Sequence, residues 1–127
     1  MGFTTAAFIR RNTPELRKRL EALGYYLHPE CIDDDRGNYL FANREYYLNR
    51  PLGYSEELSR SIDCGTNEDL FLAIAALRDD TSANQYWVFD QDFLPHYKKG
   101  DFTIGHFNRC SCYCHVASVK ELIEHFK

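Results

Sequence analysis

The chain has 127 residues and a formal net charge of −4 at pH 7. A chain of this length suits one ordinary domain and buries roughly two thirds of its unfolded surface, so it needs no metal or disulfide to fold. The acidic charge disfavours nucleic-acid binding, which depends on Lys and Arg, and no apolar run approaches the ~18 residues that cross a membrane.

The first predicted elements are a strand over residues 4–9 and a helix over residues 13–24. Thr13 is a typical N-cap, and Pro14 suits the first helical position. The leucines that recur at i, i+4 and i+7 on one helix face are Leu16, Leu20 and Leu23. Gly24 supplies the left-handed residue that commonly ends a helix.

A region rich in short strands follows the first helix. Aromatic and β-branched runs predict strands at residues 25–28, 39–42, 45–48 and 62–64. Turn-forming residues at 33–38 separate two of these strands, and residues 49–53 are predicted to form a loop.

The second predicted helix lies in the segment TNEDLFLAIAALRDD, residues 66–80, with Thr66 or Asn67 as its N-cap. Every residue from 70 to 77 is apolar, so this helix must be buried around most of its circumference. We therefore expect it at the centre of the core.

Three strands and a helix complete the predicted fold. The strands cover residues 86–89, 102–105 and 110–116, and residues 94–100 form a loop. The last helix begins at Ser118, which forms a capping box with Glu121. These elements predict a single α+β domain over residues 1–127, with a mixed, mostly antiparallel sheet packed by three helices.

The segment CSCYCH, residues 110–115, has the most chemical appearance in the chain. On a regular strand Cys110, Cys112 and Cys114 share one face, with neighbours about 6.6–6.8 Å apart. Sulfurs that share a tetrahedral zinc lie roughly 3.8 Å apart, so a strand favours small buried side chains over a metal site. Two alternatives remain. One is reactive thiols, and the other is a metal site, which requires a looped segment and would be completed by His106 and His115.

Cys64 is the other candidate thiol. It ends a predicted strand just before a helix N-terminus, a position that lowers the pKa of a thiol. However, Leu70 stands where a phosphatase-like loop requires Arg, and Glu68 and Asp69 would repel an anionic substrate. Structural packing is the prediction for Cys64, and thiol-dependent catalysis is the alternative.

A basic cluster and many aromatic residues are the candidate binding surfaces. The basic residues at and before the first helix are Arg10, Arg11, Arg17, Lys18 and Arg19. We interpret them as a solvated helix face, with weak nucleic-acid binding as an alternative. The aromatic residues that could form an exposed patch are Tyr46, Tyr47, Tyr54, Tyr86 and Trp87.

Three segments resemble a known group of proteins: NTPELRKRLEALGY, IDCGTNEDLFLAIAALRDDTSANQYWV and ASVKELIEHF. They are similar to small α/β proteins of gut bacteria of the Bacteroides type and of their mobile elements, a group without an established activity. The resemblance implies a bacterial, intracellular origin and assigns no catalytic residue.

The leading functional interpretation is a non-enzymatic module that binds a protein partner. The sequence contains no cofactor motif, so no cofactor is expected. Five cysteines are an odd count, which fits thiols in a reducing compartment. The N-terminal residues also lack a secretory signal, so we expect a cytoplasmic location.

Overall fold

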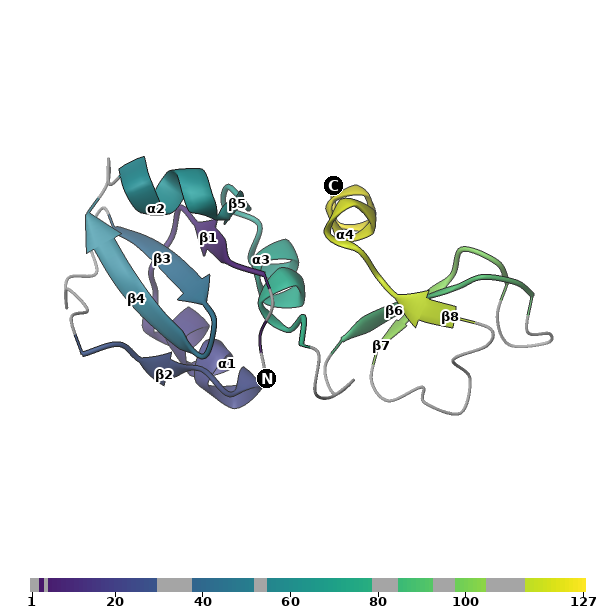
Figure 1. Ribbon diagram of the computed structural model, residues 1–127, viewed down its shortest axis with the longest axis horizontal. Helices are drawn as coiled ribbons and strands as arrows, with labels where there is room; N and C mark the ends of the chain where they lie inside the picture. The colour runs from purple at the N-terminus through teal and green to yellow at the C-terminus, as the bar shows by residue number, and fades with distance from the viewer. Residues whose placement is uncertain are drawn as a thin grey trace.

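The computed structural model describes residues 3, 5–29, 38–51, 55–78, 85–92, 98–104 and 114–127. In these ranges the chain forms eight strands and four helices (Figure 1). In chain order they are β1 (Ala7–Ile9), α1 (Pro14–Leu23), β2 (Tyr26–Leu27), β3 (Asn38–Asn43), β4 (Tyr46–Pro51), α2 (Ser55–Arg60), β5 (Ile62–Asp63), α3 (Glu68–Ala75), β6 (Tyr86–Phe89), β7 (Phe102–Ile104), β8 (Cys114–Val116) and α4 (Val119–His125).

The strands divide into two sheets. The larger has the order β2-β4-β3-β1-β5, in which β3 is antiparallel to both neighbours while β2 and β5 pair in parallel at the two edges. The smaller has the order β7-β6-β8 and is antiparallel throughout. The predicted α+β class with mostly antiparallel pairing is confirmed, but the strands form two sheets rather than one.

Helix α1 forms for the predicted local reasons. The Thr13 side chain accepts a hydrogen bond from the Leu16 amide at 3.2 Å, and Pro14 opens the helix. Gly24 has φ +109°, a left-handed conformation that ends the helix, and its N–H donates to the carbonyl of Glu21. Leu16 and Leu20 are completely buried.

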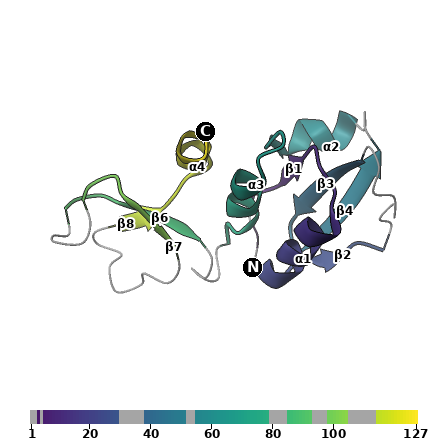
Figure 2. The ribbon, with the colours of Figure 1, turned by 180° about the vertical axis from the view of Figure 1, so that it is seen from behind.

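Helix α3 occupies the centre of the molecule, as predicted. Asn67 caps it by accepting from the Leu70 amide at 3.2 Å, and all residues from 70 to 77 are buried. The helix ends at Ala75, earlier than the apolar run, because the Leu77 amide donates to the carbonyl of Ile74 in a tighter turn. Figures 1 and 2 show α3 between the two sheets.

One apolar cluster joins both sheets through α3. It includes Ile9 and Leu40 from the larger sheet, Phe71 from α3, Val88 from the smaller sheet and Leu122 from α4. A second cluster lies on the opposite face of the larger sheet, under α2: its buried members are Phe8, Tyr39, Phe41 and Leu48.

In the middle of the chain one prediction was wrong and one helix was missed. Residues 49–51 continue β4 instead of forming a loop: Asn49 lies opposite Leu40, and Pro51 lies opposite Asn38. Pro51 is tolerated because it is the last residue of β4. Strand β2 pairs only with Tyr46 and Tyr47, so no neighbour on that side requires an N–H from Pro51. Helix α2 was not predicted, because its sequence SEELSR has a single apolar residue, Leu58, which packs against the second cluster.

Candidate functional site

The structure gives Cys64 a packing role. Its side chain is 4% exposed, and its Sγ donates to the carbonyl of Ile62 at 3.8 Å. Burial, with a smaller effect of the Asp63 charge, raises the pKa of Cys64 to about 12. The thiol therefore stays protonated at neutral pH, and this geometry does not support the thiol-enzyme alternative at Cys64.

The cysteine-rich segment is described only from Cys114 onward. In β8, Cys114 is buried and His115 is exposed on the opposite face, which agrees with the predicted alternation. The other candidates, Cys110, Cys112 and His106, lie outside the described residues. Within the described ranges no three His, Cys, Asp or Glu side chains form a group that could hold a metal ion.

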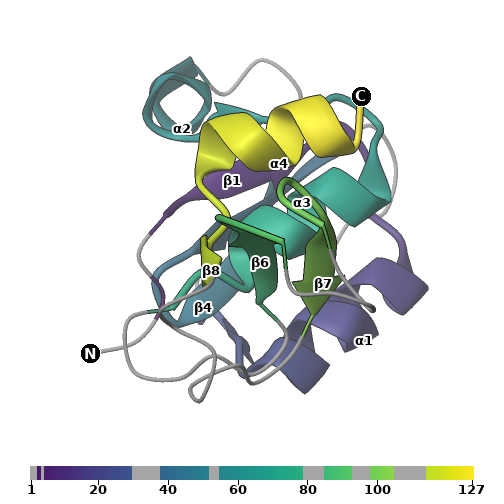
Figure 3. The same ribbon diagram turned by 90° about the vertical axis from the view of Figure 1, so that its right-hand side faces the viewer.

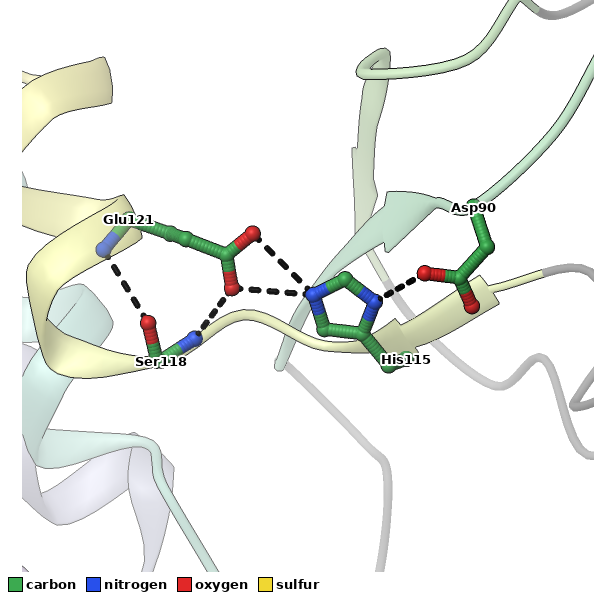
Figure 4. A network of polar contacts seen from close by, with 4 residues as sticks. All are labelled: Asp90, His115, Ser118 and Glu121. Atoms are coloured by element: carbon green, nitrogen blue, oxygen red, sulfur yellow. Dashed lines mark hydrogen bonds and ion pairs between the residues drawn. The ribbon is translucent and has the colours of Figure 1, made fainter.

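His115 instead bridges two carboxylates (Figure 4). Its Nδ1 lies 2.6 Å from Asp90 Oδ1, at the end of β6. Its Nε2 lies 2.9 and 3.0 Å from the two carboxylate oxygens of Glu121, in the first turn of α4. Because carboxylates accept hydrogen bonds, both ring nitrogens must donate, and the arrangement requires the protonated imidazolium. We call Asp90, His115 and Glu121 the His115 bridge.

The capping box of α4 holds Glu121 in place for this contact. The Glu121 amide donates to Ser118 Oγ at 3.2 Å, and the Ser118 amide donates to Glu121 Oε1 at 2.9 Å. One carboxylate thus caps the helix and binds the imidazole (Figure 4). The capping box was predicted, whereas the contact with Asp90, 25 residues before His115, was not.

The charges of the bridge support each other. Desolvation alone would lower the pKa of His115, but hydrogen bonds and charges from Glu121 and Asp90 outweigh it and raise the pKa. Desolvation would raise the pKa of Glu121, but the Ser118 amide and His115 lower it. Since both imidazole nitrogens are occupied, the bridge is suited to fastening α4 to the smaller sheet rather than to acid–base catalysis.

The predicted aromatic patch is not exposed as a unit. Tyr47 and Trp87 are buried, Tyr46 and Tyr86 are half-buried, and Tyr54 lies outside the described residues. Among the residues that the structure describes, the most exposed large hydrophobic side chains are Tyr26, at 67%, and its neighbour Leu27, at 56%. Sequence reasoning missed both because an amphipathic pattern does not reveal which strand lies at an edge.

Strand β2 forms one edge of the larger sheet. The amides of Tyr26 and His28 donate to the carbonyls of Glu45 and Tyr47, at 3.0 and 2.9 Å. Backbone groups alternate in direction along a strand, so the N–H and C=O of Leu27 point away from β4. Tyr26 lies opposite Tyr46, whose ring centroid is 4.5 Å from that of His28. We call Tyr26, Leu27, His28 and Tyr46 the edge strip.

Acidic residues offset much of the basic cluster. Arg10 pairs with Asp63 at 2.8 Å, while Arg11 and Arg19 lie 3.1 and 4.0 Å from Glu68. The Arg17 guanidinium donates to Asn12 Oδ1 at 2.9 Å. These contacts weaken the positive field that phosphate binding requires.

Comparisons with known proteins identify no relative: no family model, no curated protein and no solved structure matches the chain significantly. Among the described residues no helix is both long enough and apolar enough to cross a membrane.

Proposed function

We propose that the protein is a non-enzymatic module that binds an extended segment of a partner protein along β2. The observation that carries this proposal is the edge strip, in which the outward backbone groups of Leu27 lie between exposed apolar side chains. An extended peptide that adds to such an edge gains main-chain hydrogen bonds and side-chain contacts.

The hydrogen-bond pattern indicates that a partner strand could pair with only a short stretch of β2. The amide of Tyr25, before β2, donates to the carbonyl of Leu20 at 3.1 Å. Pro29, after β2, has no N–H to donate. Between them Leu27 offers one donor and one acceptor, so a partner strand would exchange two hydrogen bonds with this residue.

Side chains must then supply most of the affinity and selectivity. Tyr26, His28 and Tyr46 lie on one face of the sheet edge, since β2 and β4 pair in parallel with Tyr26 opposite Tyr46. This aromatic surface suits an apolar or aromatic side chain of the incoming strand. Natural sheet edges are commonly protected by charged residues, and neither residue of β2 is charged.

The test is selection of a phage-displayed random peptide library on the intact protein. We expect enrichment of extended peptides rich in β-branched and aromatic residues, because these favour strands. Tyr26→Ser and Leu27→Ser should each weaken the selected peptides about tenfold, which corresponds to ~1.4 kcal/mol. Ile104→Ser is the matched control, since Ile104 is 53% exposed on an edge strand of the other sheet.

Two outcomes contradict the proposal. One is that repeated selection yields no peptide above background. The other is that selected peptides bind Tyr26→Ser and Leu27→Ser as well as they bind the unmodified protein.

We also propose that the protein acts in the bacterial cytoplasm. The supporting observations are the resemblance of its three segments to proteins of gut bacteria and its odd number of cysteines. Fractionation of bacteria that carry the gene should place the protein with cytoplasmic markers. Recovery with periplasmic or secreted markers would refute this part of the proposal.

A further inference from the structure

A small cavity lies where α1, α3 and the smaller sheet meet. Its volume is about 180 Å³, and its lining residues are Arg19, Leu23, Asp69, Leu72, Ala73, Tyr86 and Ile104. They come from α1, α3, β6 and β7, and Figure 3 looks along the long axis of the molecule, with the smaller sheet in front of α3 and α1. The edge strip lies elsewhere, on β2 and β4.

The cavity carries opposite charges that do not pair with each other. Arg19 is 4.0 Å from Glu68, at the limit of an ion pair, and no ion pair joins it to Asp69. Asp69 forms no ion pair within the ranges that the structure describes. A cation and an anion, not paired with each other, therefore line one cavity.

Tyr86 experiences both charges. Burial raises the pKa of its phenol, the charge of Asp69 raises it further, and the charge of Arg19 lowers it. The hydroxyl thus lies within the electrostatic reach of both groups, and it is a further hydrogen-bonding group for a polar ligand.

The rest of the lining is apolar. The aliphatic surface comes from Leu23, Leu72, Ala73 and Ile104, and Ile104 is 53% exposed. The volume admits on the order of ten water-sized groups, which suits a small molecule and is too little for a nucleotide.

We propose that this cavity binds a small zwitterion, namely an α-amino acid with an aliphatic side chain. Arg19 would hold the carboxylate, Asp69 the ammonium group, and the aliphatic residues the side chain. This inference is independent of the proposed function, because the two sites share no residue.

The first test adds three matched probes to the unmodified protein and measures their binding through the amide signals in ¹⁵N-resolved NMR spectra. L-leucine carries both charges, 4-methylpentanoate lacks the ammonium group, and 3-methylbutylamine lacks the carboxylate. We expect L-leucine to shift the amide signals of Leu23, Ala73 and Ile104, and each analogue to bind about tenfold more weakly or worse, since it leaves one charge unpaired. Absence of shifts at millimolar L-leucine, equal binding of an analogue, or shifts confined to other residues would overturn the proposal.

The second test removes each charge from the protein. Arg19→Gln and Asp69→Asn should each weaken L-leucine binding about tenfold. Lys18→Gln and Glu15→Gln, on the same helix α1 but outside the cavity lining, should leave it unchanged. Equal binding by all four variants would overturn the proposal even if the unmodified protein binds the amino acid.

Discussion

The two sheets are stabilised in different ways. In the larger sheet β1 is buried along its whole length, β3 is buried at residues 39–42 and β4 at residues 47–49, with apolar clusters on both faces. In the smaller sheet the central strand β6 is largely buried, whereas β7 and β8 expose Ile104, His115 and Val116. The comparison teaches that apolar burial fixes the larger sheet, while the outer strands of the smaller sheet depend on contacts with α4.

Those contacts are partly polar and partly aromatic. The His115 bridge ties β8 and the end of β6 to α4, and the ring of His125 stacks on Phe102 of β7 at 3.9 Å. Exposed polar contacts are individually worth less than a buried aromatic side chain. Mutations should therefore have their largest effects in the shared core and smaller effects at α4.

The largest expected effect comes from Phe71→Ala, in the helix between the sheets. Phe71 is completely buried, so the substitution should lower the free energy of unfolding by about 3–5 kcal/mol. Chemical denaturation monitored by circular dichroism measures this change. Ile123→Ala, at a position 39% exposed on α4, is the control. A loss below about 1 kcal/mol for Phe71→Ala would contradict the central role of α3.

The next effect comes from the capping box of α4. Ser118→Ala removes the acceptor of the Glu121 amide and should lower the free energy of unfolding by about 1 kcal/mol. Ser118→Thr keeps the hydroxyl and should retain most of the stability. If denaturation curves show the alanine and threonine variants to be equally stable, the cap does not contribute as the structure indicates.

A smaller, pH-dependent effect should come from the His115 bridge. The pKa of His115 is raised in the folded state, so its contribution is full below the unfolded pKa and is lost as pH rises through the folded value. The free energy of unfolding should therefore fall as the pH rises, by less than about 1 kcal/mol because solvent screens the exposed pair. His115→Gln should remove this fall. Denaturation from about pH 6 to about pH 9 measures it. His28→Gln is the control. If the free energy of unfolding of His115→Gln depends on pH as strongly as that of the unmodified protein, the His115 bridge does not contribute as described.

The smallest effect on stability is expected at the edge strip. Tyr26 is 67% exposed, so Tyr26→Ser should change the free energy of unfolding by less than about 0.5 kcal/mol. The same variant should bind the selected peptides about tenfold more weakly. A large loss of stability would show that Tyr26 is a structural residue of the larger sheet rather than a binding residue.

Local sequence signals predicted much of this fold. Thr13, Gly24, Ser118 and the apolar run at residues 70–77 act within their own helices, so their roles are readable from spacing. The division into two sheets was not readable, because it depends on which distant strands pair.

The candidate sites were less predictable for the same reason. The exposure of Tyr26 follows from the edge position of β2, and the bridge needs Asp90 and Glu121 from two other elements. For Cys64 the sequence predicted structural packing, with an activated thiol as the alternative because the residue lies before a helix, and tertiary burial outweighs that local effect on the pKa.

Hydrogen exchange of the Leu27 amide, measured by NMR, tests the central claim most directly. We predict fast exchange in the free protein, because this N–H points outward from β2, and slow exchange once a selected peptide is bound. The amide of His28, which donates to Tyr47 within the sheet, is the internal reference. Protection of Leu27 in the free protein, or exchange unchanged by bound peptide, would contradict strand addition at this edge.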